Sequence, residues 1–385
     1  MANLNDIAAL ADSLEKPRIA VQQERCVRVR NRHASCSRCL DACPSGALGI
    51  EDNRIAYAAS LCTACGACTA VCPTEALRPL EPAEAALREA CDRAADCADG
   101  TVAIACARIA SKRGGDPDKY AEVPCLGRVD ESLMLQAAAS GASRLVLVDG
   151  DCDTCKYGPC GRLAAEAAED AAGIAASCGS GFPIERVTGF PPELALEAPE
   201  GRFGTDRRGF FSETAAAVKE TTLTAARTTL NQKLGGAPAE EGLGRRLRVG
   251  SGGSLPQYPM PRRDAALDAI DALGFPEGPT VGRRLFGAVS IDPAACNGCG
   301  MCATFCPTGA LRRVDGPDGK TLSALEFLAS DCVGCGLCAD VCWKDALDLS
   351  REVSPQQLFS FEPVSFPVDP ANRESGPGLG KSFIR

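Results

Sequence analysis

Residues 62–73 read CTACGACTAVCP, in which four cysteines follow the spacing C-x2-C-x2-C-x3-C. The same spacing returns in CNGCGMCATFCP at 296–307 and in CVGCGLCADVCW at 332–343. A fourth copy is stretched, because nine residues separate Cys26 from the run CSRCLDACP that starts at Cys36. Two copies lie near each end of the chain, so the repeats predict two paired modules with a different domain between them.

The chain has 24 cysteines in 385 residues. Whether they form disulfides or bind metals depends on the cellular compartment of the protein. The start of the chain has no basic segment followed by an apolar one, so we expect no secretory signal. No stretch approaches the 18 apolar residues of a membrane span, and we place the protein in the cytoplasm. Cysteines there are kept reduced, which favours metal ligands or redox groups over disulfides. The net charge of -9 makes nucleic acid a poor partner.

The cysteine run resembles that of bacterial ferredoxins, which hold [4Fe–4S] clusters. In two-cluster ferredoxins the fourth cysteine of each run ligates the other cluster. The resemblance therefore implies four [4Fe–4S] clusters, held by four sets of cysteines. Set 1 is Cys26, Cys36, Cys39 and Cys72; set 2 is Cys62, Cys65, Cys68 and Cys43; set 3 is Cys296, Cys299, Cys302 and Cys342; set 4 is Cys332, Cys335, Cys338 and Cys306. Structural zinc bound by four cysteines is the alternative, although zinc sites rarely need such triplets.

Two details of these runs stay open. The loop at 27–35, VRVRNRHAS, carries three arginines and His33, the only histidine. It either raises a cluster potential or docks an acidic partner, or it is an ordinary solvated loop. Trp343, the only tryptophan, replaces the proline that follows the other runs, and it either shields set 3 from water or fills a small core. Between the paired runs, the patterns at 46–57 and 309–327 predict β-hairpins.

The middle of the chain has a different pattern. Buried-strand patterns at 101–107, 121–127 and 144–150, with a further strand at 183–190, alternate with helical patterns. This alternation predicts a small parallel sheet with flanking helices. The expected fold class is α+β, with two ferredoxin-like 2[4Fe–4S] modules flanking a small α/β parallel-sheet domain.

Five further cysteines lie near the carboxyl ends of the predicted strands. They are Cys106, Cys125, Cys152, Cys155 and Cys160. Because the carboxyl ends of parallel strands meet at one edge of a sheet, we expect a fifth site there, holding a [2Fe–2S] or [4Fe–4S] cluster or zinc. The alternatives are a redox-active disulfide between Cys152 and Cys155, or simple burial as small hydrophobic residues. Burial is also our interpretation of Cys91, Cys97 and Cys178.

Residues 123–158, VPCLGRVDESLMLQAAASGASRLVLVDGDCDTCKYG, resemble the delta subunit of methyl-viologen-reducing hydrogenases, the hydrogenase iron–sulfur subunit. That family has a Cys-x-Gly-Arg-Val segment, a helix, a strand and then a cysteine pair before His-Tyr. The matching positions are Cys125, Gly127, Arg128, Val129, Cys152, Cys155 and Tyr157. Lys156 replaces the histidine, and the cysteine pair is spaced by two residues where the family has four. The resemblance implies a [2Fe–2S] cluster that passes electrons between a hydrogenase or formate dehydrogenase and a heterodisulfide-reductase-like partner.

Composition sets the expected domain boundaries. We expect the N-terminal module at 1–79, the middle domain at 80–190, a basic connector rich in Gly and Pro at 191–285, the C-terminal module at 286–350 and an extended tail at 351–385. Helical patterns occur in the connector at 212–230 and 262–274. Its repeated arginine pairs favour docking, either to a partner or to a cluster module of the chain itself, over a solvated linker.

These features together predict a polyferredoxin-like electron-transfer subunit of an oxidoreductase complex in anaerobic metabolism. With one histidine there is no Ser/His/Asp set, and no glycine-rich phosphate loop is present. Flavin or nicotinamide chemistry is therefore assigned to a partner of formate dehydrogenase or hydrogenase type. One alternative is a reductase with a substrate-binding cluster in the middle domain. Another is an iron–sulfur redox sensor or maturation factor.

Overall fold

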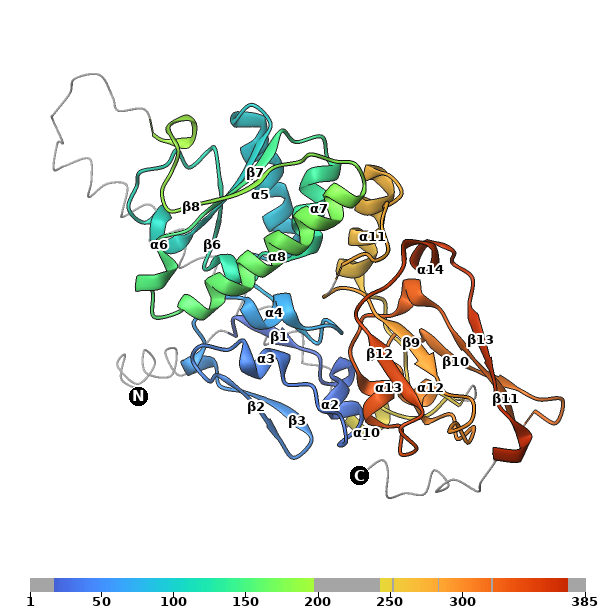
Figure 1. The fold of residues 1–385 in the computed structure, drawn as a ribbon. Coiled ribbons are helices and arrows are strands. Elements are labelled where there is room, and N and C mark those ends of the chain that lie inside the picture. The colour runs from blue at the N-terminus through green and yellow to red at the C-terminus, as the bar shows by residue number, and fades with distance from the viewer. Residues whose placement is uncertain (1–16, 197–242, 251–252, 283, 320, 373–385) are drawn as a thin grey trace, which may run out of the picture. The chain divides into compact units, whose positions relative to one another are not determined.

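The computed structural model describes residues 17–196, 243–250, 253–282, 284–319 and 321–372 (Figure 1). The chain divides into two compact units, Met1–Leu196 with Val249–Arg385, and Glu197–Arg248. In the second unit, α10 (Leu243–Arg246) is described, whereas the helix expected at 212–230 lies outside the described residues. All 24 cysteines belong to the first unit.

A four-stranded parallel sheet lies in the middle of the first unit, and its strand order is β6-β5-β7-β8. The strands are β5 (Thr101–Cys106), β6 (Ala121–Val123), β7 (Arg144–Val148) and β8 (Ile184–Val187). This confirms the predicted parallel sheet. Every residue of β5 is buried, as expected for a strand covered on both faces. The chain places β6 on one side of β5 and β7 on the other, so the switch point of the sheet lies between β5 and β7.

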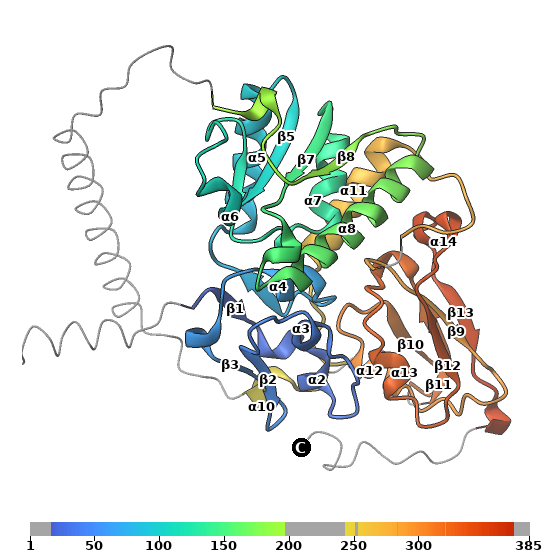
Figure 2. The ribbon, with the colours of Figure 1, turned by 60° about the vertical axis from the view of Figure 1, so that its left-hand side comes forward.

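Helices from both the middle domain and the connector cover this sheet (Figure 2). They are α5 (Glu84–Cys97), α6 (Ala107–Ala110), α7 (Glu131–Ala139), α8 (Gly158–Ser177) and α11 (Pro261–Leu273). The side chain of Asp130 caps α7 by accepting a hydrogen bond from the backbone N–H of Leu133. The connector helix α11 packs on α7 and begins at Pro261. It ends at Leu273 with Gly274 as its cap, close to the pattern predicted at 262–274.

The N-terminal module consists of two antiparallel strand pairs around short helices. Its elements are β1 (Ile19–Val21), α2 (Val27–Arg30), α3 (Arg38–Asp41), β2 (Leu48–Glu51), β3 (Arg54–Tyr57), α4 (Ala67–Val71) and β4 (Leu77–Pro79). β1 pairs with β4, and β2 pairs with β3 in the predicted hairpin. Asp52 and Asn53 form the hairpin turn with φ of 47° and 62°, the left-handed conformation that such turns require.

The C-terminal module repeats this plan. Its elements are β9 (Ala288–Ile291), α12 (Met301–Phe305), β10 (Leu311–Asp315), β11 (Leu322–Phe327), α13 (Leu337–Asp340) and β12 (Leu347–Ser350). β9 pairs with β12, as β1 does with β4, and β10 pairs with β11 in the second predicted hairpin. Two outer pairs and two inner hairpins thus hold the four cysteine runs in equivalent positions.

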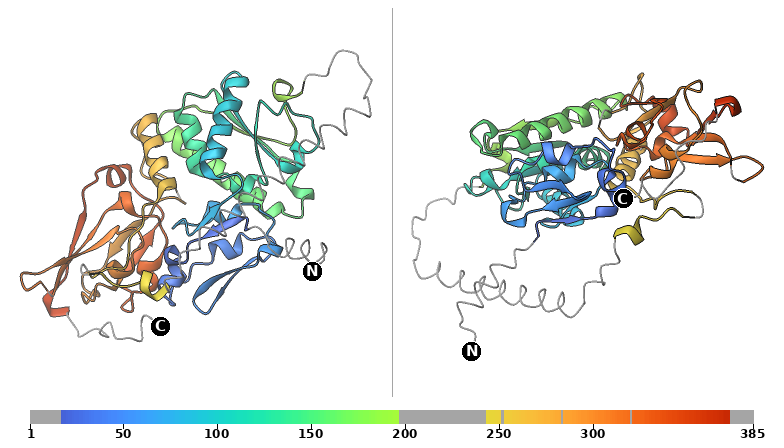
Figure 3. Two further views of the ribbon diagram at one scale, coloured as in Figure 1. Left: turned by 180° about the vertical axis from the view of Figure 1, so that it is seen from behind. Right: turned by 90° about the horizontal axis from the view of Figure 1, so that it is seen from below.

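The tail differs from the extended segment that its composition suggested. Residues Pro355–Phe359 form the helix α14, which begins because the Ser354 side chain accepts a hydrogen bond from the backbone N–H of Gln357. Residues Val364–Pro367 form β13, which pairs with β11 and extends the hairpin to a three-stranded sheet. Figure 3 shows this sheet, in orange to red, from two further sides.

Short 3-10 helices connect these elements. They are η1 (Gln23–Arg25), η2 (Ala59–Leu61), η3 (Leu126–Arg128), η4 (Cys152–Thr154), η5 (Pro192–Leu194), η6 (Ala329–Asp331) and η7 (Pro370–Asn372). Among the described helices, none has the length and apolar character needed to cross a membrane.

Candidate metal centres

The four cysteines of set 1 line one small cavity in the N-terminal module. Cys26 precedes α2, Cys39 lies within α3 and Cys72 ends α4, so three short elements bring the thiols together. Burial raises the pKa of Cys26 to about 11 and that of Cys39 to about 12. The backbone N–H of Ala76 donates to the Cys72 sulfur at 3.3 Å, a bond of the kind that tunes cluster potentials.

Set 3 has the same arrangement in the C-terminal module, where its four cysteines also line one cavity. The backbone N–H of Ala346 donates to the Cys342 sulfur at 3.3 Å, which repeats the bond made to Cys72. Trp343 stands on the wall of this cavity and is 45% exposed. A side chain with that exposure does not fill a core, so its position favours the interpretation that it shields set 3 from water.

Sets 2 and 4 are also brought together, as the electrostatics of one central cysteine in each set shows. Burial raises the pKa of Cys68, and the charges of the other three cysteines of set 2 raise it further. The pKa of Cys338 is raised by burial and then by the charges of its three partners in set 4. Buried sulfurs that repel one another as thiolates suit a cationic metal group, whose assembly removes their protons.

The glycines of the runs supply the backbone conformation that these loops need. Gly66, Gly300 and Gly336 precede α4, α12 and α13 with φ of 74°, 70° and 83°. A residue with a Cβ atom is strained in this left-handed conformation, which explains glycine at these positions. Each glycine lets the chain turn sharply after one cysteine, so that the next cysteine enters a helix facing the same site.

The family model of the 4Fe-4S dicluster domain matches residues 34–76 and 289–346. Both end modules are therefore ferredoxin-type dicluster modules. The match supports [4Fe–4S] clusters and an electron-transfer role. No curated protein and no solved structure matches the chain.

The match covers neither residues 123–158 nor the connector, so the resemblance of the middle domain to the hydrogenase delta subunit stays a prediction. Over the ranges that the structure describes, no group of three or more histidine, cysteine or acidic side chains is arranged to hold a single metal ion. A four-iron cluster is a different case, since it takes its thiolates on separate iron atoms.

The cysteine sets of the two dicluster modules lie in a definite order. Cys39 of set 1 is near enough to Cys68 of set 2 to raise its pKa, although burial contributes more. Cys302 of set 3 acts in the same way on Cys338 of set 4. The junction between the modules falls between sets 1 and 4, because the charge of Cys36 contributes, after burial, to the raised pKa of Cys335. The resulting order is 2, 1, 4, 3.

The loop at 27–35 joins the two dicluster modules. Arg30 is 4% exposed and donates from Nε to the carbonyl of Phe305 at 3.1 Å, and from Nη2 to that of Cys306 at 3.4 Å. Its Nη1 donates to the carbonyl of Pro256 at 2.8 Å. The hydroxyl and backbone N–H of Ser35 both donate to the Asp340 carboxylate, at 2.9 and 2.7 Å. The loop therefore docks the C-terminal module of its own chain.

A third contact continues the junction. The Arg38 side chain, which lies between Cys36 and Cys39, donates to the carbonyl of Gly334 at 2.7 Å. Gly334 in turn lies between Cys332 and Cys335. Burial lowers the pKa of Arg38, and the charge of Arg351 lowers it further. The ligand loops of sets 1 and 4 are thus in direct hydrogen-bonded contact.

The connector also docks on the N-terminal module, through Arg262. Its guanidinium donates to the carbonyls of Thr69, Ala70 and Cys72 at 2.6–2.7 Å, which are the last residues of α4 and its cap. It also pairs with Asp130 at 3.5 Å, at the start of α7. One arginine therefore ties the cysteine run at 62–73 to the middle domain, as the paired arginines of the connector favoured.

The middle-domain cysteines divide into two groups. Cys160, in the first turn of α8, is fully buried and packs with Cys65 of set 2, and Cys125 lies against this pair. Hydrogen bonding from Cys160 lowers the pKa of Cys65 to about 6 and also lowers that of Cys125. The thiol of Cys160 thus bridges two sulfurs, and its own pKa is raised. No local pattern in the sequence indicated that a middle-domain cysteine would touch a ferredoxin-type run.

The other three members of the expected fifth site lie elsewhere on the same edge. Cys106 ends β5 and belongs to the main apolar core. Cys152 begins η4 and Cys155 follows its last residue. The pKa of Cys152 is raised by burial and then by the charge of Asp149, while a hydrogen bond with Arg186 lowers it. The charge of Cys125 also raises the pKa of Cys152, after these larger contributions.

Three cysteines were interpreted as packing residues, and they differ in exposure. Cys91 is buried in α5, and burial raises its pKa to about 12. Cys178 is half-buried at the end of α8. Cys97 is exposed at the end of α5, so the packing interpretation is wrong for this residue. An alanine-rich helix does not reveal which of its faces is covered.

Proposed function

We propose that this chain is an electron-transfer subunit in which four [4Fe–4S] clusters form one continuous wire. Sets 2, 1, 4 and 3 hold the clusters in that order along the wire. The observation that carries the proposal is the hydrogen bond from the Arg38 side chain to the carbonyl of Gly334 at 2.7 Å, because it joins the ligand loop of set 1 to that of set 4. Each cluster, when bound, supplies a site that gains or loses one electron, and the protein sets its potential through burial and hydrogen bonds.

The chain's own residues hold the wire together. Arg30, Ser35 and Arg38 fix the ligand loops of sets 1 and 4 against each other. Arg262 fixes the end of α4, which carries Cys72, against the middle domain. These arginines bring positive charge next to the thiolates, which favours reduction of a nearby cluster. Rigid docking keeps the distance between neighbouring clusters constant.

The middle domain lies at the set 2 end of the wire, because Cys125 and Cys160 pack against Cys65. We assign the fifth site to this region, with Cys106, Cys152 and Cys155 as the remaining candidate ligands. The resemblance to the hydrogenase delta subunit supports a partner of formate dehydrogenase or hydrogenase type at this end. Electrons then leave or arrive at set 3, behind Trp343.

Magnetic coupling between reduced clusters tests the wire. In the fully reduced protein, EPR spectra should show coupling that extends across both modules. The Cys39→Ser variant should lose cluster 1. The clusters of the C-terminal module then couple only to each other, so their EPR signal should narrow. The matched variant Cys299→Ser should lose cluster 3 and keep the coupling of sets 2, 1 and 4. If Cys39→Ser leaves the C-terminal signal unchanged, the two modules are magnetically independent and the wire is refuted.

The assignment of the partner needs its own test. Anaerobic purification of the chain from its native cells should bring down a stoichiometric catalytic subunit that contains molybdenum, tungsten or nickel. A redox sensor or maturation factor would instead purify without such a subunit. The Cys125→Ser variant then tests the fifth site, because it should reduce the iron content without changing the signals of the four ferredoxin-type clusters.

A further inference from the structure

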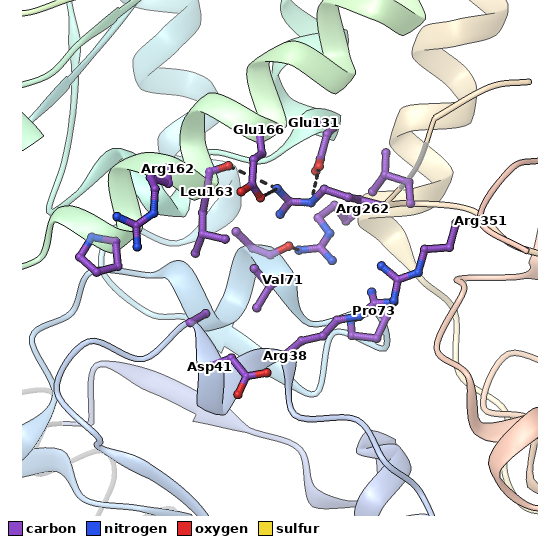
Figure 4. Close-up of a pocket in the computed structure, with 15 residues that line it drawn as sticks. Arg38, Asp41, Val71, Pro73, Glu131, Arg162, Leu163, Glu166, Arg262 and Arg351 are labelled. Carbon is purple, nitrogen blue, oxygen red and sulfur yellow. Dashed lines mark hydrogen bonds and ion pairs between the residues drawn. The ribbon is translucent and has the colours of Figure 1, made fainter.

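We propose that a cavity beside sets 1 and 2 binds a small organic molecule that carries a phosphate monoester. The cavity has a volume of about 410 Å³ and opens between α3, α4, α8 and α11 (Figure 4). This volume falls in the range of pockets that bind small molecules. Five of the residues that line it are arginines: Arg38, Arg162, Arg262, Arg284 and Arg351.

Two of these arginines are already neutralised. Arg284 pairs with Glu131, with Nε and Oε1 2.8 Å apart, and approaches Glu166 at 3.7 Å. Arg262 pairs with Asp130 and donates to three carbonyls, as described above. These two side chains are part of the framework that shapes the cavity.

The other three arginines give the cavity excess positive charge. In the described part of the chain, neither the side chain of Arg162 nor that of Arg351 has a hydrogen bond or ion pair with another residue. Arg38 donates to a backbone carbonyl and has no carboxylate partner among the described residues. The positive charge of Arg351 lies near enough to Arg38 to repel its positive charge. The remaining carboxylate, Asp41, is engaged with the hydroxyl of Ser37 at 2.6 Å. Asp41 keeps its charge, so the five arginines of the lining face three carboxylates, and this excess of positive charge around one cavity favours a bound anion.

The shape and chemistry of the lining indicate the class of anion. Guanidinium groups bind phosphate oxygens in bidentate fashion, and three of them match a dianion better than a single carboxylate. The first turns of α8, a helix of 20 residues, line the same wall, and the positive end of its dipole adds to the attraction. Val71, Pro73, Leu163 and Leu285 form an apolar surface next to the arginines, which suits an organic group attached to the phosphate.

The position of the cavity gives binding a consequence for electron transfer. Arg38 lies between two cysteines of set 1, Pro73 follows Cys72, and Ala42 precedes Cys43 of set 2. A dianion here makes the addition of an electron to either cluster less favourable, so it lowers their reduction potentials. This consequence rests on the proposed function, whereas binding itself does not.

Isothermal titration calorimetry on the anaerobic, cluster-loaded full chain tests the proposal. The probes are inorganic phosphate, AMP and FMN, with adenosine and riboflavin as counterparts that lack the phosphate. We expect saturable binding of phosphate and of at least one ester, about tenfold or more tighter than its phosphate-free counterpart. Arg162→Gln and Arg351→Gln should each weaken binding about tenfold. The control Arg93→Gln changes an exposed arginine of α5 outside the cavity and should leave binding unchanged.

Two results would overturn the proposal. The first is that phosphate, AMP and FMN bind the wild-type chain no more tightly than the Arg162→Gln/Arg351→Gln double variant. The second is that a polyaspartate peptide binds to these arginines and neither phosphate nor the esters displace it, which would assign the cavity to a protein partner. Equal iron contents of all variants show that these outcomes do not reflect loss of clusters.

Discussion

Replacement of Arg30 by methionine should loosen the junction between the two dicluster modules. Methionine keeps much of the apolar stem of the buried arginine but removes every donor. The carbonyls of Phe305, Cys306 and Pro256 then lose their partner. With a net value of about 1 kcal/mol for each of three hydrogen bonds, the junction loses about 3 kcal/mol. That change corresponds to a roughly 150-fold larger population of the open junction.

Hydrogen exchange measures this opening directly. The backbone N–H of Leu255 donates to the carbonyl of Thr304 and that of Tyr258 to the carbonyl of Pro307, each at 2.9 Å, so these two amides report on the contacted segment. In Arg30→Met their exchange should accelerate about 100-fold, because exchange follows the free energy of local opening. Amides of β5 and β7 should exchange as in the wild type.

The matched control is Arg54→Met, which changes an exposed arginine in β3 of the same module. It should leave the exchange of Leu255 and Tyr258 unchanged. If Arg30→Met accelerates these amides less than threefold at full cluster loading, the guanidinium does not hold the junction and the reasoning fails.

Three other changes have expected outcomes of different kinds. In thermal melts, Gly66→Ala should destabilise the protein by about 1–3 kcal/mol more than Gly336→Ala does. Both glycines have positive φ, so both substitutions strain the backbone. A Cβ on Gly66 would also lie 2.6 Å from the Cβ of Arg128, whereas nothing lies within 4 Å of a Cβ on Gly336. Equal losses would contradict the close approach of α4 to η3. Arg284→Gln should cost about 3 kcal/mol near neutral pH because Glu131 is left buried without its partner. Burial raises the pKa of Glu131, so above about pH 4.3 this carboxyl keeps its proton in the folded variant and loses it in the unfolded chain. The free energy of unfolding, measured with urea, should therefore fall as the pH rises above about 4.3. A further Glu131→Gln change should remove this dependence, and its persistence would assign it to another group. Removal of iron by an anaerobic chelator should abolish hydrogen-exchange protection in the two end modules. Protection of β5 and β7 should remain, because their apolar core needs no metal. Loss of protection in all three regions together would show that the middle domain depends on the clusters.

Local patterns in the sequence were sufficient to predict the elements around the sites. The strand at β7 is a run of apolar residues between polar ones, and the turn at Asp52 and Asn53 has side chains that tolerate left-handed backbone. The structure places the four cysteines of set 1 around one cavity and those of set 3 around another, while the assignment of all sixteen cysteines as cluster ligands stays a prediction. The parallel sheet was predictable because strand patterns and helix patterns alternate along the middle of the chain.

Contacts between distant segments were not predictable in this way. Arg30 and Arg32 look alike in the sequence, yet Arg30 is buried at the junction and Arg32 is exposed. The contact of Cys160 with Cys65 joins α8 to a ferredoxin-type run, and no periodicity encodes it. In the structure, a Cβ on Gly127 would lie 2.7 Å from the Cβ of Cys160, so glycine at 127 permits the close approach of η3 to α8. The strand β13 escaped prediction because its pairing partner β11 lies 37 residues or more away in sequence.

The content of iron and acid-labile sulfide per chain, after anaerobic purification, tests the central claim most directly. Four [4Fe–4S] clusters require about sixteen iron atoms and as many sulfides per chain, and a loaded fifth site adds a clear excess. A chain that is colourless under exclusion of oxygen, or that holds zinc in place of iron, would contradict the account, because no electron could then travel from one module to the other.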